Sequence, residues 1–180
     1  MRLKTVIQST LISISFLACS TGQKKSPNFT WGQGIETIKT SEADRLRQSP
    51  LEERAHNPLI SSVTYEDRFL NAQCHLSYWF EKNRLELVSY SCSNPDWDEE
   101  ELKGNVRQKM ASLHGEPEQV ATGEKWYDHY RAQDAHIYFR LVRIPSDSLA
   151  FRTFQANIFY AQKSHKDSKL LQNILSTFGR

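Results

Sequence analysis

Hydrophobic and polar residues alternate most regularly in the middle of the chain, over two stretches that a short polar segment joins. Ala72–Phe80 and Leu85–Cys92 both have the period of two that is typical of β-strands. The polar Glu81–Arg84 between them indicates a turn. This part of the sequence therefore predicts an antiparallel hairpin.

The alternation also predicts the register of the hairpin. A three-residue turn at Lys82-Asn83-Arg84 pairs Glu81 with Leu85, Tyr78 with Val88, Leu76 with Tyr90 and Cys74 with Cys92. This register gathers the apolar side chains on one face, whereas a slip by one residue would scatter them. Cysteines directly opposite each other lie close enough for a disulfide when their pair is not hydrogen-bonded.

The remaining pattern predicts three helices and four further strands or strand-like runs around this hairpin. The helices are expected at about 34–46, from about 95 to 113, and at 167–178. The strands are expected at Leu59–Tyr65, Glu124–Tyr130, His136–Ile144 and Phe151–Gln162. Segment 47–58 carries two prolines and is expected to be a loop with at most one helical turn, at Leu51–Ala55.

The second helix has a clear inner side and two alternative starts. Leu102, Val106, Met110 and Leu113 recur at helical spacing. Its cap is either Asn94, with a proline at the first helical position, or Asp96, with Glu99 three residues later. Gly115 and Pro117 are expected to end it.

The order of these elements predicts an α+β fold. Helix, three strands, helix, three strands and helix suit an antiparallel sheet with helices packed on one face. The same order is consistent with a duplicated α-β-β-β unit. We expect one domain over residues 31–180.

The first 18 residues form a predicted signal peptide. Arg2 and Lys4 precede an uncharged, apolar or hydroxylic run that is too short to span a bilayer. Phe16-Leu17-Ala18-Cys19 resembles a bacterial lipobox, so Cys19 is expected to carry a lipid and residues 19–30 to form a tether. The alternatives are ordinary cleavage after Gly22, which gives a free periplasmic or secreted protein, and a buried N-terminal helix.

Loss of the signal peptide changes the charge. The chain has 23 Lys and Arg against 21 Asp and Glu, and the two basic residues of the signal, Arg2 and Lys4, account for the difference. A formally neutral mature chain does not have the clustered basic face of a nucleic-acid-binding protein. Nucleic acid is therefore not an expected partner.

Cys74 and Cys92 are the two cysteines that remain after Cys19. An even pair in an oxidising compartment predicts a disulfide, and two buried free thiols are the alternative. A catalytic Cys–His pair is disfavoured because His75 adjoins Cys74, and neighbours on a strand point to opposite faces.

Several of these features together resemble a set of small bacterial envelope lipoproteins of uncharacterised function. The features are Trp31-Gly32, the helix ending near Glu42, Tyr78-x-Phe80 with Leu85 and Tyr90, Leu113-His114-Gly115-Glu116-Pro117, Trp126 and Ile158-Phe159-Tyr160. The resemblance implies a fold and an envelope location but no catalytic residues. Ser20, the second residue of a chain lipidated at Cys19, indicates sorting to the outer membrane, facing the periplasm. Small outer-membrane assembly lipoproteins and secreted β-lactamase-inhibitor proteins look like more distant architectural relatives, and both offer a surface to another protein.

The sequence predicts no catalytic or metal-binding site. Asp128, His129, Asp134 and His136 cluster around one turn but match no known ligand spacing. The acidic run at 96–101 lacks the spacing of a calcium loop and suits the first turn of a helix. There is no nucleophile elbow, phosphate loop or His-Glu-x-x-His, so no cofactor is expected.

The sequence thus leaves three hypotheses for function. The first is a non-catalytic, lipid-anchored module that binds a protein partner in the envelope. The second is a module that binds a small ligand or a cell-wall fragment. The third is a hydrolase with a hidden site at Asp128, His129 and His136. For the first two, Trp79 and Trp126 are the candidate surface aromatics. Coverage of these side chains by helices is the alternative.

Overall fold

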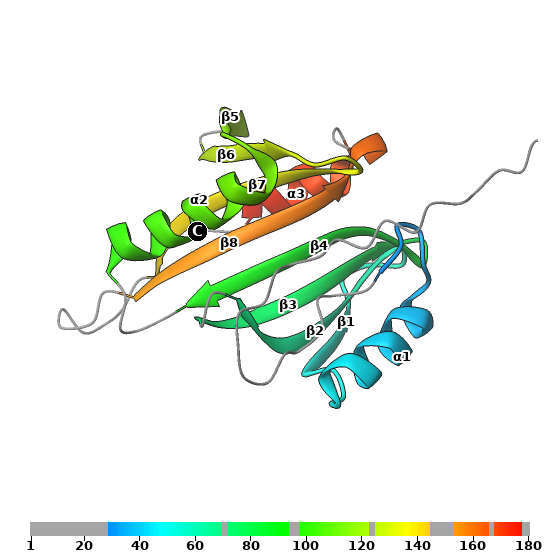
Figure 1. Ribbon diagram of the computed structural model, residues 1–180. Coiled ribbons are helices and arrows are strands. Elements are labelled where there is room, and N and C mark those ends of the chain that lie inside the picture. The colour runs from blue at the N-terminus through cyan, green and yellow to red at the C-terminus, as the bar shows by residue number, and fades with distance from the viewer. Residues whose placement is uncertain are drawn as a thin grey trace, which may run out of the picture.

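The computed structural model describes residues 29–69, 72–93, 98–122, 125–144, 153–165 and 168–177 (Figure 1). The helices are α1 (Ile35–Leu46), α2 (Glu99–His114) and α3 (Lys169–Thr177), and a 3-10 turn, η1, covers Lys163–His165. The strands are β1 (Glu52–Ala55), β2 (Ile60–Phe69), β3 (Ala72–Glu81), β4 (Arg84–Ser93), β5 (Glu118–Thr122), β6 (Lys125–Arg131), β7 (Ala135–Ile144) and β8 (Thr153–Gln162).

All eight strands belong to one antiparallel sheet, so the predicted α+β class is confirmed. The strand order is β1-β2-β3-β4-β8-β7-β6-β5. Each half is a four-stranded meander that follows one helix, and the halves join where β4 pairs with β8 in the centre. In Figure 1 one meander lies below this pair and the other above it. The repeated unit is therefore α-β-β-β-β, one strand longer than predicted.

The two strands that were not predicted, β1 and β5, are the edges of the sheet. All four residues of β1 are exposed, so no buried face imposes an alternation of apolar and polar residues. The loop or helical turn expected at 51–55 was therefore wrong. β5 is also short, and β6 is its partner in the described sheet.

The predicted hairpin forms with the predicted register at its cysteines but with a different turn. Lys82 and Asn83 both have positive φ, 51° and 61°, and Glu81 pairs with Arg84. These are the features of a two-residue primed turn. A bulge between Trp79 and Phe80 then restores the predicted pairing.

Cys74 and Cys92 form the predicted disulfide. They are directly opposite each other on β3 and β4, and their Cα atoms are 4.0 Å apart. This short separation is typical of an antiparallel pair that is not hydrogen-bonded.

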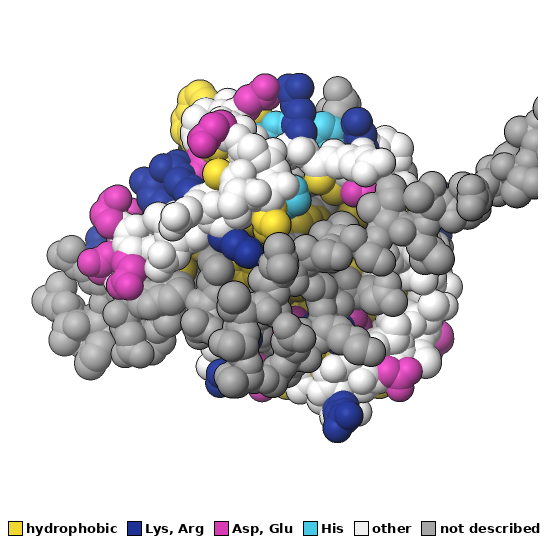
Figure 2. Space-filling view, viewed as in Figure 1, with side chains coloured by type: hydrophobic (Ala, Val, Ile, Leu, Met, Phe, Trp, Pro, Cys, Tyr) yellow, Lys and Arg dark blue, Asp and Glu magenta, His cyan; other side chains and the backbone are white. Residues whose placement is uncertain are grey.

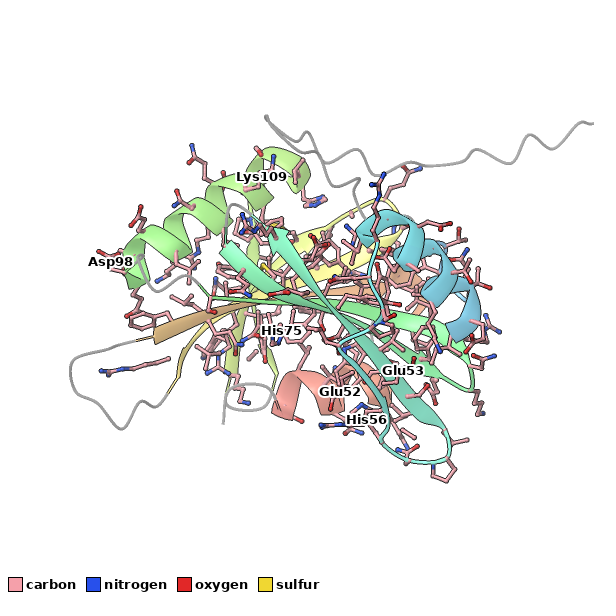
Figure 3. All side chains as sticks on the ribbon, turned by 90° about the horizontal axis from the view of Figure 1, so that it is seen from below. Glu52, Glu53, His56, His75, Asp98 and Lys109 are labelled. Carbon is pink, nitrogen blue, oxygen red and sulfur yellow. A yellow bond between two sulfur atoms is a disulfide. The ribbon has the colours of Figure 1, made fainter. Side chains whose placement is uncertain are left out.

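Helices cover both faces of the sheet, which corrects the prediction of one covered face. Ile38 of α1 and Val106 of α2 pack in one core cluster, whereas α3 packs in another cluster with Leu87, Tyr127 and Phe159. Figure 3 shows α1 and α2 on one side of the sheet and α3 on the other. The physical reason is that β8 carries buried apolar residues on both sides, as central strands do when both faces are covered.

α2 begins at a cap other than the two that the sequence suggested. The side chain of Asp98 accepts a hydrogen bond of 2.8 Å from the backbone N–H of Glu101. Asn94 and Asp96 lie outside the described residues. The helix ends as predicted at Gly115, whose φ is 82°. Figure 2 shows acidic side chains gathered at one end of α2, where its first turn lies.

α1 buries an ion-pair network against β2. Arg45 lies 2.6 Å from a carboxylate oxygen of Glu42 and 2.9 Å from one of Asp67. All three side chains are buried. The network fixes the otherwise polar α1 to the sheet.

The predicted signal peptide, Cys19 and Gly22 lie outside the described residues, so the N-terminal predictions stay predictions. Among the helices that are described, none is long and apolar enough to cross a membrane.

Candidate functional site

Trp126 is the most exposed large apolar side chain among the described residues, at 63% of its surface. Alternation along β6 places Trp126, Asp128 and Tyr130 on the face that carries α2, because Tyr130 packs in the same core cluster as this helix. Tyr127 belongs to the cluster around α3 and thus points the other way. Trp126 therefore stands out from the α2 side of the sheet, close to its β5 edge.

A cleft of about 370 Å³ lies on the same face, between α2 and the β5–β6 hairpin. Its lining residues are Arg107, Gln108, Ala111, Glu116, Pro117, Gln119, Asp128 and Tyr130. Asp128 and Tyr130 follow Trp126 at every second position of β6, so the exposed indole and the cleft belong to one surface. We call this surface, formed by Trp126 and the cleft, the Trp126 surface.

Asp128 lines the cleft and is only 4% exposed. Arg107 donates to both of its carboxylate oxygens, at 2.5 Å from Nε and 2.9 Å from Nη2. Gln119 donates a third hydrogen bond to Asp128. The bond to Asp128 raises the pKa of Arg107, so its guanidinium stays charged at neutral pH.

Tyr130 adds an unused polar group to the cleft. Its hydroxyl is buried and has no hydrogen-bond partner. Burial raises its pKa to about 12, so the hydroxyl stays protonated and can donate to a ligand or partner. The lining described contains no histidine, cysteine or serine, and it offers groups for binding rather than a nucleophile with its base.

The residues of the hydrolase hypothesis are not brought together. His129 Nε2 and His136 Nδ1 are 2.8 Å apart, but Asp128 lies on the opposite face with Arg107. Asp134 accepts a hydrogen bond of 3.1 Å from the indole of Trp31. The site that the hydrolase hypothesis needs at Asp128, His129 and His136 therefore does not form. In the described part of the chain, no three His, Cys, Asp or Glu side chains are placed to hold a metal.

His129 and His136 instead form an in-plane hydrogen bond across β6 and β7. Their rings are within 17° of parallel. Atoms of stacked rings do not approach within about 3.5 Å, so a nitrogen–nitrogen distance of 2.8 Å means that the rings meet edge to edge. Glu118 Oε2 lies 3.9 Å from the other nitrogen of His129. This separation is too long for a hydrogen bond, and the buried Nδ1 of His129 has no hydrogen-bond partner.

Trp79 and Trp126 lie on opposite faces of the sheet. Trp79 is half-buried, and its Nε1 donates a hydrogen bond of 3.0 Å to Ser89 Oγ. Its ring lies nearly parallel to that of His56, with 4.9 Å between the ring centres. It packs against the cluster around α3. The two tryptophans therefore do not form one surface, and Trp126 is the more accessible of them.

The sequence missed Arg107 and Gln119 as site residues. Arg107 follows the buried Val106, so helical periodicity places it at the margin of the inner side of α2. Gln119 lies on β5, which the sequence did not predict. No protein-family model matches the chain, and the searches of curated proteins and of solved structures gave no match either.

Proposed function

We propose that the chain is an exported, non-catalytic protein that is held in the bacterial envelope by a lipid on Cys19 and binds another protein through the Trp126 surface. The observation that carries the proposal is the 63% exposure of Trp126 beside a cleft with fixed polar groups. Tryptophan is enriched among the residues that contribute most to protein interfaces.

The edge of the sheet supports a protein rather than a small molecule as the partner. In the sheet as described, β6 is the neighbour of β5, and the outer side of β5 has no strand beside it. An extended segment of a partner could add to this side by main-chain hydrogen bonds while Trp126 fills a pocket of that partner. Charged side chains on an edge strand discourage such pairing. The other edge strand, β1, has three of them, Glu52, Glu53 and Arg54, whereas β5 has one, Glu118.

The envelope location rests on the N-terminal sequence and on the cysteines. A basic start, a short apolar run and a cysteine at its end suit a lipoprotein signal. The disulfide between Cys74 and Cys92 suits an oxidising compartment. The resemblance to small envelope lipoproteins points the same way.

The partner surface can be tested by photo-crosslinking in living cells. A photoreactive residue at Gln108, an exposed position in the lining of the cleft, should give one crosslinked species of defined mass. Trp126→Ala should abolish this species, whereas Leu59→Ala, which removes another exposed apolar side chain, should leave it. An unchanged crosslink in the Trp126→Ala protein would contradict the proposal.

The anchor can be tested separately by mass spectrometry of the mature N-terminus. We expect a diacylated peptide that begins at Cys19, and a soluble protein when Cys19 is replaced by alanine. Ordinary cleavage after Gly22 would instead give an unmodified peptide that begins at Gln23. That result would contradict the lipid anchor and indicate a free protein, but it would not bear on the proposed partner surface.

Binding of a small ligand or wall fragment is the second candidate function. Its support is the volume of the cleft, about 370 Å³, which falls within the range of small-molecule sites. The cleft is on the other face from Trp79, the second candidate surface aromatic. Saturable binding of wall fragments that is lost in Arg107→Gln would favour this function.

A further inference from the structure

A row of polar side chains crosses the sheet on the face that carries α3. The pairing of neighbouring strands places Glu66 opposite His75, His75 opposite Ser91, Ser91 opposite Asn157, and Asn157 opposite Arg140. Figure 3 labels His75 within this part of the sheet. Polar groups in the centre of a sheet need partners, and two members of this row each have one buried nitrogen without a hydrogen-bond partner.

Asn157 is the first of these two. Its side chain is 1% exposed, on the central strand β8. Oδ1 accepts a hydrogen bond of 2.8 Å from the hydroxyl of Ser91, but Nδ2 has no partner. A buried amide N–H without an acceptor costs about 1–3 kcal/mol, so a ligand oxygen that accepted from it would be favoured.

Arg140 is the second, and it is the cross-strand neighbour of Asn157 on β7. Its guanidinium carbon lies 5.8 Å from the centre of the Tyr127 ring. Its Nη1 is buried and has no acceptor. Among the ion pairs of the described residues, none neutralises this guanidinium.

Tyr127 and α3 form the wall beside Arg140. The hydroxyl of Tyr127 donates a hydrogen bond of 2.5 Å to the backbone carbonyl of Leu175. The ring that lies against Arg140 is therefore held in place by the end of α3. Arg140 itself is only half-buried, which keeps its side chain within reach of solvent.

We propose that Arg140 and Asn157 form a binding site for an oxyanion, the carboxylate or phosphate group of a small ligand. A guanidinium without a counter-charge and a buried amide donor are the two groups that such an oxygen ligand satisfies together. The site is on the opposite face from the Trp126 surface, so it is independent of the proposed protein partner.

The first test is calorimetric titration of the mature protein with succinate and with inorganic phosphate, at constant ionic strength. Saturable binding of either probe is expected, and the tighter of the two identifies a carboxylate or a phosphate ligand. Arg140→Gln should weaken binding at least tenfold. Arg143→Gln removes an exposed charge from the opposite face of the same strand and should leave binding unchanged. Absence of binding to both probes, or equal binding by Arg140→Gln, would overturn the site.

A second variant keeps the proposal testable if Arg140→Gln folds poorly. Asn157→Asp places a carboxylate of the same size beside Arg140, so it should raise the thermal midpoint at pH 7 and abolish binding of the probes. If Arg140 needed no counter-charge, burial of this carboxylate would instead lower the midpoint. A lowered midpoint would therefore refute the proposal without any titration.

Discussion

The side-chain oxygen of Asn83 accepts a hydrogen bond of 3.0 Å from the backbone N–H of Ile35, the first residue of α1. The residue before the helix, Gly34, has no side chain with which to cap it. The cap thus comes from the turn between β3 and β4. Two backbone bonds between the same segments, Gly32 to Leu85 and Leu85 to Gln33, hold this arrangement.

We expect Asn83→Gly to destabilise the protein by about 1 kcal/mol, the usual contribution of a helix cap. Glycine is the informative replacement because φ of Asn83 is 61°, where glycine is not strained and other residues are. Lys82→Gly is the matched control, since Lys82 has a similar φ of 51° and makes no cap. Denaturant unfolding measures the difference, and equal effects of the two variants would contradict the cap.

Removal of the disulfide should have a larger effect. Cys74 and Cys92 are 18 positions apart, and closure of a loop of this size corresponds to about 3 kcal/mol in the chain-entropy model. The double variant Cys74→Ser and Cys92→Ser should lose this stability in urea unfolding. In a Cys19→Ser background, a thiol reagent should find no reactive thiol before reduction and two after it. Thiols that react without reduction would disprove the bond.

Arg45→Met tests the buried network of α1. Loss of the cation leaves Glu42 and Asp67 as buried carboxylates without a counter-charge, which should destabilise the fold by about 3–5 kcal/mol. Arg54→Met is the control, because Arg54 pairs with Glu52 on the surface, where an ion pair contributes at most about 1 kcal/mol. Similar midpoints of chemical unfolding for the two variants would rule out a stabilising role for the network.

Stability should fall as the pH is lowered through the range in which histidine titrates. Burial lowers the pKa of His56, His114 and His129 below the ordinary value of 6.5. Below about pH 6.5 the unfolded chain therefore binds more protons than the folded chain, and acid favours unfolding. The thermal midpoint between pH 7.5 and 5.5 measures this. His129→Gln should flatten the slope, and an unchanged slope in this variant would contradict the prediction.

The sequence predicted those parts of the fold in which one face of an element is buried. The alternation from Cys74 to Phe80 and the helical spacing of Leu102, Val106 and Met110 were both confirmed as core. β1 could not be found this way, because an exposed edge strand has no apolar face. The pattern also could not predict on which face of the sheet α3 packs. β8 has buried apolar residues on both faces, so a helix could cover either of them.

The candidate site was predicted only in part. Trp126 was a candidate surface aromatic, with coverage by a helix as the alternative, and it is exposed. Its neighbour in the site, Arg107, comes from a helix far away in the sequence and is positioned by a pairing with Asp128 that no local pattern encodes. Grouping Asp128 with His129 failed for a simpler reason, because adjacent residues of a strand point to opposite faces.

The central pair of β4 and β8 separates two meanders that can each form before this pair does. The turn between β3 and β4 joins Glu81 to Arg84, so each meander can form from contacts that are local in the chain. Pairing of β4 with β8 instead joins Ser93 to Gln155, and it must close a long loop before it gains any stabilisation. Pairing of β4 with β8, rather than formation of the hairpins, should therefore set the rate at which this sheet assembles.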